Sequence, residues 1–170
     1  AVGKVASELY LRIYQELYGI DYTVLRYFNV YGHKQNMSNL KQGIISIYLK
    51  QFIDESFEEV QVKGSLERFR DFSHIDDVID VTIESINNKN FFNQIINVGT
   101  GEKIKVKEIL RLLKIYLKSD KKIKLLGGTK GDQFGVFADV TKLKSLYPQK
   151  FVSFDQGLEK TIKKICDKEV

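Results

Sequence analysis

Two short apolar segments constrain the fold of this chain more than any other feature of its sequence. Residues 22–28 (YTVLRYF) and 93–98 (NQIINV) are runs of apolar, β-branched and aromatic side chains. Such runs are typical of strands that a parallel sheet buries on both faces. Each run follows a segment with helical character, at residues 2–18 and 75–87, and this alternation predicts an α/β fold.

The remaining segments predict shorter elements around these two strands. Helices are predicted over residues 42–54, 105–118 and 155–168, with a short helical turn at 140–146. Short strands are predicted at 59–63, 70–73 and 122–126, and residues 29–39 are expected to form a loop. Ser153 and Gln156 have capping-box spacing at the start of the last helix.

A sheet with only two central strands would leave long apolar edges uncovered, which soluble proteins avoid. We therefore predict that these residues are part of a larger sheet, whose remaining strands lie upstream of Ala1. The 170 residues are 43% hydrophobic and 29% charged, which suits one globular domain and argues against a disordered chain.

Composition argues against several kinds of protein. No apolar run approaches the roughly 20 residues of a membrane span, and the start Ala1-Val2-Gly3-Lys4 has no signal-peptide layout, so a cytoplasmic location is expected. The single cysteine, Cys166, excludes an internal disulfide and a cysteine-cluster zinc site, and no metal is expected. The net charge of +5 comes from lysines rather than clustered arginines, so neither nucleic acid nor membrane is expected as a partner. The densest basic stretch, 114–124, predicts a solvated face, with mild attraction of anionic ligands as the alternative.

Four motifs in a fixed order resemble the extended short-chain dehydrogenase/reductase family. They are GKVASE at 3–8, LRYFNVYG at 25–32, RDFSHIDDV at 70–78 and NVGTG at 97–101, supported by Gly131-Asp132 and Ala138-Asp139. More narrowly, they resemble the NAD-dependent nucleotide-sugar epimerases and dehydratases, of which UDP-glucose 4-epimerase is the best-known type. The resemblance covers only the C-terminal half of that family's chain. It implies NAD as cofactor and a nucleoside-diphosphate sugar as substrate.

The resemblance also implies a division of the chain. Residues 1–35 would end an NAD-binding Rossmann-type domain, and 76–99 would supply its return helix and strand. Residues 36–75 and 100–170 would mainly form the smaller α/β substrate-binding lobe. The family's glycine-rich dinucleotide fingerprint is absent, because Gly99-Thr100-Gly101 lies late in the chain and lacks a third glycine. We therefore expect these residues alone to bind NAD poorly and to have no turnover.

The family's catalytic pair is a Tyr-x-x-x-Lys on one helix face. Lys4 matches the lysine, so the tyrosine is expected immediately before Ala1. Residues four apart share a helix face, and a nearby ammonium lowers the pKa of a tyrosine. By resemblance, Lys4 also binds the nicotinamide ribose. Taken alone, the same residue is typical of an ordinary solvated helix lysine.

Further roles come from the resemblance one residue at a time. Tyr27 and Phe28 would lie near the nicotinamide, and Asn29 would donate to a substrate phosphate, unless Asn29 only bonds its own backbone in a turn. The nucleotide base would be contacted by the backbone of Asn39 and Leu40 and by the strand that holds Gln61 and Lys63.

Arg70 is the predicted diphosphate clamp, because a guanidinium matches a pair of phosphate oxygens. The alternative is a structural ion pair with Asp71 or Asp76. Asp71 and Asp77 are predicted to be structural, supporting the arginine and capping a helix, and His74 is predicted to be a loop histidine. Asp132 would meet a sugar hydroxyl or merely close its loop. Thr129 stands where many relatives carry a second clamping arginine, and the adjacent Lys130 would replace it only as a point charge.

The helix at 2–18 predicts an interface. Tyr10, Tyr14 and Tyr18 lie beside an apolar stripe, as in relatives that form homodimers through this helix, although one broad core face would give the same pattern. The sequence therefore predicts the C-terminal half of an NAD-dependent nucleotide-sugar 4-epimerase. Two alternatives remain open: a 4,6-dehydratase of the same family, and a non-catalytic module that binds sugar nucleotides or dimerises.

Overall fold

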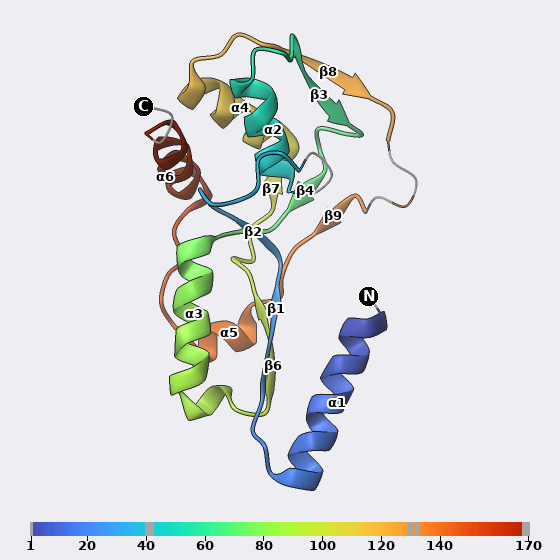
Figure 1. The fold of residues 1–170 in the computed structure, drawn as a ribbon, viewed down its shortest axis with the longest axis vertical. Helices are drawn as coiled ribbons and strands as arrows, with labels where there is room; N and C mark the ends of the chain where they lie inside the picture. Colours follow the sequence, from blue (N-terminus) through green and yellow to red (C-terminus); the bar gives the residue numbers. More distant parts are fainter. Residues whose placement is uncertain (1, 40–42, 129–130, 132, 168–170) are drawn as a thin grey trace.

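The structure is a computed structural model that describes residues 2–39, 43–128, 131 and 133–167. Its elements are arranged in two parts joined by a short parallel pair of strands (Figure 1). In chain order they are α1 (Val2–Tyr18), β1 (Thr23–Tyr27), β2 (Asn29–Tyr31), α2 (Ile44–Ile53), β3 (Glu59–Lys63), β4 (Phe69–Arg70), β5 (Phe72–His74), α3 (Ile75–Asn87), a 3-10 turn (Lys89–Phe91), β6 (Gln94–Val98), β7 (Ile104–Lys105), α4 (Val106–Leu117), β8 (Lys122–Leu126), β9 (Gly135–Val136), α5 (Thr141–Leu146) and α6 (Phe154–Cys166).

The two predicted central strands are neighbours. β1 and β6 pair in parallel, from Thr23 opposite Gln94 to Tyr27 opposite Val98. α3 packs against β1 and α5 against β6, while α1 lies on the other side (Figure 1). The parallel pairing confirms the predicted α/β class. The predicted burial of β1 on both faces is wrong for this chain, because no residue of α1 is buried and Arg26 and Tyr27 are exposed.

The second part is built around another parallel pair, β3 and β8, against which α2 and α4 pack. Val60 and Val62 of β3 point into this layer and are fully buried, whereas Gln61 and Lys63 alternate with them on the exposed face. A small sheet of β7, β4 and β9 lies beside it. The pair β2 and β5 links the two parts, because β2 directly follows β1 and β5 directly precedes α3.

Buried apolar side chains form two separate hydrophobic cores. The α2–α4 core consists of Tyr31, Ile45, Tyr48, Leu49, Phe52, Val60, Val62, Phe72, Val106, Ile109, Leu110, Leu112, Leu113, Phe154, Leu158 and Ile162. The β1–β6 core consists of Val78, Val81, Phe91, Ile96, Val98, Ala138, Val140 and Leu143. The β1–β6 core takes in α5, which the sequence division grouped with the other lobe; the domain boundaries stay a prediction.

Most predicted elements match the structure closely. The helix at 75–87 and the strands at 59–63 and 122–126 have the predicted bounds. Ser153 caps α6 by accepting the Gln156 N–H, and its hydroxyl donates to Gln156 Oε1. Residues 70–73 instead belong to two strands, β4 and β5, and the predicted loop at 29–39 begins with β2. In the part of the chain that the structure describes, no helix has the length and apolarity to cross a membrane.

Candidate functional site

A pocket of about 260 Å³ lies beyond the carboxyl end of β1, where the chain passes from one sheet to the next. Phe28 donates its N–H to Val98 O of β6 at 3.2 Å, and Asn29 donates its N–H to Asp71 O at 3.1 Å. The crossing therefore occurs between these two residues, and both line the pocket. Ligands of open α/β sheets bind beyond the carboxyl ends of strands at such crossings.

The side chain of Asn29 is held in place by a neighbouring strand. Its Nδ2 donates to Asp71 O at 2.9 Å, and the residue is half-buried. Asn29 thus begins a strand and bonds across to another segment, rather than bonding its own backbone in a turn. An amide carries two Nδ2 hydrogens, so one hydrogen remains for a ligand in the pocket.

Tyr27 and Lys4 lie outside this pocket. Thr82 Oγ1 donates to Val78 O, so its contact of 2.9 Å with Tyr27 Oη is one in which the tyrosine hydroxyl donates. This hydrogen bond directs Tyr27 towards α3 rather than towards Phe28 and Asn29. Lys4 is exposed on the first turn of α1, and that end of the helix lies towards the carboxyl end of β1 (Figure 1).

Arg70 is fixed against main-chain carbonyls. Its guanidinium donates to Gln133 O at 2.9 Å, to Phe134 O at 3.4 Å and to Phe69 O at 2.8 Å. Partial burial, together with the nearby Arg68, lowers the pKa of Arg70, yet a guanidinium stays charged in proteins. The carboxylates named as alternative partners contact other groups: Asp71 accepts from backbone groups, and Asp76 pairs with Lys160.

Asp71 makes more contacts than the sequence predicted. Its carboxylate is fully buried and accepts hydrogen bonds from Thr100, Gly101 and Ala138. It therefore supports the Gly99–Gly101 loop and the segment before α5, not the guanidinium of Arg70. The motif Gly99-Thr100-Gly101 carried a signal for this: a Cβ at residue 99 would lie 2.8 Å from Asp71 Oδ2.

The other predicted site residues are dispersed. Gln61 and Lys63 lie on the exposed face of β3, in the part of the molecule that holds the α2–α4 core. Asn39 is exposed at the end of a described segment. Leu40 and Asp132 lie outside the described residues, as do Thr129 and Lys130. Of the predicted site residues, Phe28 and Asn29 both line the pocket. Arg70 directly precedes Asp71, whose carbonyl accepts from Asn29.

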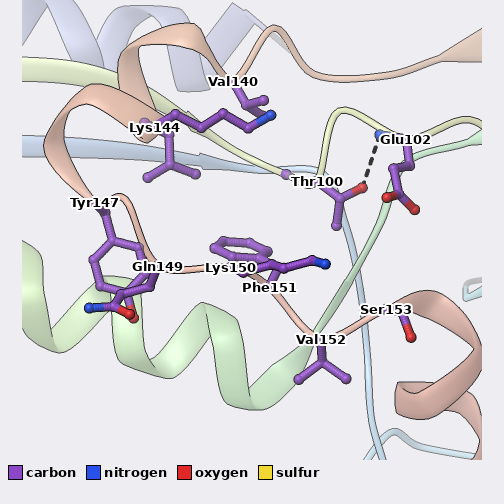
Figure 2. A pocket seen from close by; sticks show the side chains of 12 residues that line it. Thr100, Glu102, Val140, Lys144, Tyr147, Gln149, Lys150, Phe151, Val152 and Ser153 are labelled. Carbon is purple, nitrogen blue, oxygen red and sulfur yellow. Dashed lines mark hydrogen bonds between the residues drawn. The ribbon is translucent and has the colours of Figure 1, made fainter.

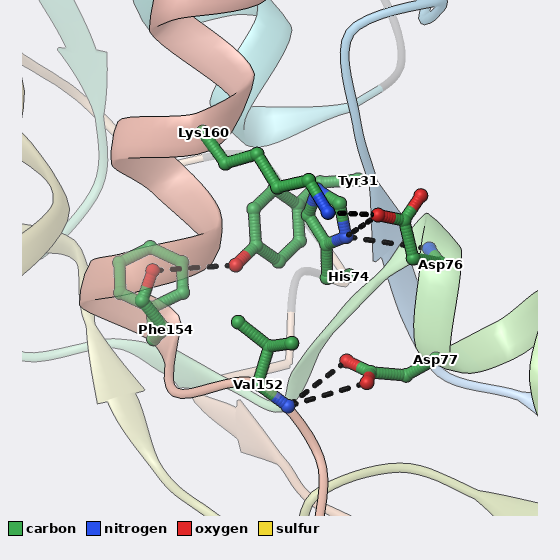
Figure 3. A network of polar contacts seen from close by, with 7 residues as sticks. All are labelled: Tyr31, His74, Asp76, Asp77, Val152, Phe154 and Lys160. Carbon is green, nitrogen blue, oxygen red and sulfur yellow. Dashed lines mark hydrogen bonds and ion pairs between the residues drawn. The ribbon is translucent and has the colours of Figure 1, made fainter.

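A polar network at the start of α3 has a structural role (Figure 3). His74 is buried, not a loop histidine: its Nδ1 caps α3 by accepting the Asp76 N–H at 3.3 Å, and burial lowers the pKa of His74. The ion pair with Lys160 lowers the pKa of Asp76. Asp77, predicted to cap a helix, instead accepts the Val152 N–H, and burial raises its pKa. These contacts fasten α6 and the segment before it to α3.

A second pocket of about 270 Å³ lies between α5, residues 147–153 and the loop after β6 (Figure 2). Apolar side chains such as Leu143 and Phe151 line it, and Lys144 and Lys150 extend over it. Gly99 and Thr100 of the NVGTG motif line it as well, but it contains none of the residues predicted to bind cofactor or substrate. Within the described ranges, no group of three His, Cys, Asp or Glu side chains could hold a metal ion.

Comparisons with known sequences agree with the motifs. A sequence model of the "NAD dependent epimerase/dehydratase family" matches residues 1–99. The UDP-glucuronate 4-epimerase of Thermodesulfobacterium geofontis is 32% identical over 166 residues, which cover 95% of this chain and 48% of that protein. The chain spans about half the length of the curated relatives it matches.

Comparisons with solved structures confirm the fold. The UDP-glucose 4-epimerase of Thermotoga maritima, solved with UDP-glucose, matches 99% of this chain and 53% of its own, with a TM-score of 0.90 and 31% identity. The UDP-glucuronic acid 4-epimerase of Bacillus cereus, in complex with UDP-glucuronic acid and NAD, matches 98% of this chain and 52% of its own, with a TM-score of 0.80 and 26% identity. Both are Rossmann-fold proteins, so the predicted Rossmann-type α/β class is confirmed.

Proposed function

The chain belongs to the NAD-dependent epimerase/dehydratase family, and we propose that it is the C-terminal half of an enzyme that inverts a nucleotide sugar at C4. The observation that carries the proposal is the TM-score of 0.90, over 99% of this chain, with a 4-epimerase that holds UDP-glucose. The pocket beyond β1 supports it, because Phe28 and Asn29 offer an apolar ring and an amide where ligands of such sheets bind.

The residues of this chain fit one end of NAD. Phe28 lies in the pocket at the carboxyl end of β1, and Lys4 is exposed on the first turn of α1, the end of the helix that lies towards the same end of β1. No glycine-rich fingerprint for the pyrophosphate is present in the sequence. When bound, NAD supplies the hydride acceptor for oxidation at C4 and returns the hydride to the opposite face. We expect the chain alone to bind NAD poorly and to lack turnover.

Lys4 has two proposed tasks. Its ammonium hydrogen-bonds the nicotinamide ribose, and its charge lowers the pKa of the tyrosine expected four residues earlier on the same helix face. That tyrosinate takes the proton of the C4 hydroxyl as the sugar is oxidised. Because Lys4 is exposed and on a helix, it can reach both groups without leaving its secondary structure.

The diphosphate is bound by Asn29 and Arg70. The second Nδ2 hydrogen of Asn29 donates to one phosphate, and the guanidinium of Arg70 supplies the positive charge. The carbonyls of Gln133 and Phe134 orient this guanidinium, which reduces the entropy lost when a ligand binds. Towards the nucleotide base lie Asn39 and Leu40, and the exposed face of β3 with Gln61 and Lys63. Asp132 is proposed to contact a sugar hydroxyl.

α1 is proposed to have two partners. None of its residues is buried, and large apolar side chains such as Leu9, Tyr14 and Leu17 are exposed around it. An apolar helix surface this wide is covered in a stable protein. We propose that one face packs against the N-terminal half of the same protein and the other against the same helix of a second copy.

The decisive experiment uses the longer protein that contains this chain, incubated with NAD and UDP-glucose. The expected product is the C4 epimer, UDP-galactose, identified by the proton couplings of the sugar in NMR spectra. A 4-keto-6-deoxy product would overturn the epimerase in favour of a dehydratase. For the 170-residue chain alone, calorimetry should detect no stoichiometric NAD binding, and tight binding would contradict its proposed incompleteness.

A further inference from the structure

Asp71 makes more polar contacts across the molecule than a purely local role requires. We infer that it is a positioning residue, which holds Asn29 and Arg70 in the arrangement that binds a nucleoside diphosphate. The inference rests on the proposed function for the roles of Asn29 and Arg70 themselves. The inference does not make Asp71 a catalytic residue, because its carboxylate is fully buried and its hydrogen bonds go to Thr100, Gly101 and Ala138.

The carboxylate of Asp71 is saturated by hydrogen-bond donors from two distant segments. Oδ1 accepts the N–H of Thr100 at 2.8 Å and the Thr100 hydroxyl at 2.7 Å. Oδ2 accepts the N–H of Gly101 at 2.8 Å and the N–H of Ala138 at 3.0 Å. One side chain between β4 and β5 therefore ties the loop after β6 to the segment before α5.

The same residue holds Asn29 through its main chain. Asp71 O accepts both the N–H and the Nδ2 of Asn29, at 3.1 and 2.9 Å. Any displacement of the Asp71 backbone therefore moves the amide that lines the pocket. The carboxylate of Asp71 anchors the same residue through its side chain. Loss of the carboxylate contacts should therefore change the orientation of Asn29.

Arg70 is connected to Asp71 through the segment 133–138. Arg70 donates to the carbonyls of Gln133 and Phe134, and β4 pairs with β9 so that Arg70 stands opposite Val136. Asp71 holds the far end of this segment through Ala138. Arg70 and Asp71 thus contact the two ends of the segment 133–138, and the carbonyls at its start orient the guanidinium of Arg70.

The two carboxylate oxygens of Asp71 match the groups around them. All four contacting groups are donors, and a carboxylate accepts through both oxygens. Asp71→Asn keeps the shape of the side chain, but it would turn an NH₂ group towards either the two groups on Oδ1 or the two on Oδ2. Turned towards Oδ2, the NH₂ group leaves the N–H groups of Gly101 and Ala138 without an acceptor. Turned towards Oδ1, it leaves the N–H of Thr100 without one, while the Thr100 hydroxyl can rotate to accept. In either case at least one buried donor loses its acceptor, so the loop or the segment must move.

The inference can be tested first without any ligand. In ¹⁵N NMR spectra of the 170-residue chain, the Nε–H signal of Arg70 is identified by its loss in Arg70→Lys. Asp71→Asn should shift or broaden this signal, because the segment 133–138 is released. The matched control is Asp139→Asn, which changes an exposed aspartate one residue from Ala138, whose carboxylate accepts from Thr141; it should leave the signal in place.

The second measurement is calorimetric titration with UDP as the probe. Asp71→Asn should weaken UDP binding about tenfold or more, whereas Asp139→Asn should not change it. If Asp71→Asn does not fold, Thr100→Val removes a single donor to Oδ1 and should produce a smaller shift of the same Arg70 signal, while Thr100→Ser keeps the hydroxyl and should restore it.

The outcomes separate the two proposals. A folded Asp71→Asn variant with an unchanged Arg70 signal would overturn the positioning role, whatever the chain binds. If the wild-type chain does not bind UDP but Asp71→Asn still shifts the Arg70 signal, the proposed diphosphate site is contradicted. The positioning role of Asp71 would remain supported. Weakened binding together with the moved signal supports both.

Discussion

The α2–α4 core and the β1–β6 core differ in how well the sequence pattern of their strands matches the layers that cover them. β3 alternates, with Val60 and Val62 buried under α2 and α4 and with Gln61 and Lys63 exposed. β1 does not alternate, and its side chains are only half-buried or exposed. A strand that is apolar on both faces needs two covering layers. Here α3 and α5 lie on one side, and on the other side lies α1, none of whose residues is buried.

The two parts therefore differ in how much of their apolar surface this chain itself covers. The α2–α4 core is complete within this chain, since its central side chains are 0–1% exposed. In the other part, Leu17 on α1 is 67% exposed although the helix carries the spacing of a core helix. Mutations in the α2–α4 core should therefore lower stability, whereas substitutions on the exposed face of α1 should have little effect in this chain.

The largest expected effect is a cavity in the complete core. Leu113 of α4 is fully buried, so Leu113→Ala should lower the free energy of unfolding by about 2–5 kcal/mol. The matched control, Leu17→Ala on the exposed face of α1, should change it by less than about 0.5 kcal/mol. Urea titration monitored by circular dichroism measures both. Equal effects would mean that the two parts are equally well covered.

The next effect concerns the junction of the two parts, at Gly99. A Cβ there would lie 2.6 Å from the Ala138 Cβ and 2.8 Å from Asp71 Oδ2, so Gly99→Ala should cost about 1–3 kcal/mol of stability. Gly127→Ala is the control, because nothing lies within 4 Å of its added Cβ. Thermal unfolding measures the stability of both variants. If Gly99→Ala leaves the stability unchanged, the neighbouring atoms of Ala138 and Asp71 can move to make room for the added Cβ.

The sequence predicted the long elements of both parts. The helix at 75–87 has clear periodicity and acidic residues at its start, and the strand at 122–126 has the predicted bounds. Strands of two or three residues, such as β2, β7 and β9, were missed, because their pairing is set by distant partners and not by local pattern. The uncovered face of β1 could not be seen from residues 22–28, since burial depends on neighbouring layers.

The candidate site was predictable only through its motifs. Phe28 and Asn29 of the motif LRYFNVYG directly follow β1 and line a pocket, and their roles in binding stay a prediction. The orientation of Tyr27 towards Thr82 was not predictable, because it depends on which face of β1 meets α3. The hydrogen bonds of Asp71 could not be predicted, because its partners Thr100 and Ala138 are remote in the sequence. The burial of His74 was not predicted either, because it depends on how distant segments pack.

A pH-dependent effect of moderate size is expected at His74, between the two cores. Burial lowers its pKa, opposed by the charge of Asp76 and reinforced by Lys160, Lys164 and His33. The unfolded chain then binds a proton before the folded one, so stability should fall as the pH drops below about 6.5. His74→Asn keeps a capping acceptor but does not titrate. Between pH 7 and 5.5 the wild type should lose more stability than this variant in urea titrations.

The smallest effect tests how α1 is held against β1. Arg26 donates to both carboxylate oxygens of Glu8, at 2.8 and 2.6 Å, and the hydrogen bond from Arg26 lowers the pKa of Glu8. Because the pKa of Glu8 is lower in the folded chain, the ion pair stabilises the fold at pH values above the ordinary pKa of glutamate. This stabilisation is lost as the pH falls through the lowered pKa of Glu8.

Glu8→Gln should therefore speed hydrogen exchange of the α1 amides and leave exchange in α4 unchanged. High salt should produce the same change in the wild type, since exposed ion pairs are screened. The pair Lys163–Glu159, an exposed pair within α6, provides the control through Glu159→Gln, which should leave α1 exchange unaffected. If Glu8→Gln leaves exchange in α1 unaltered, the pair of Arg26 with Glu8 does not hold the helix against β1.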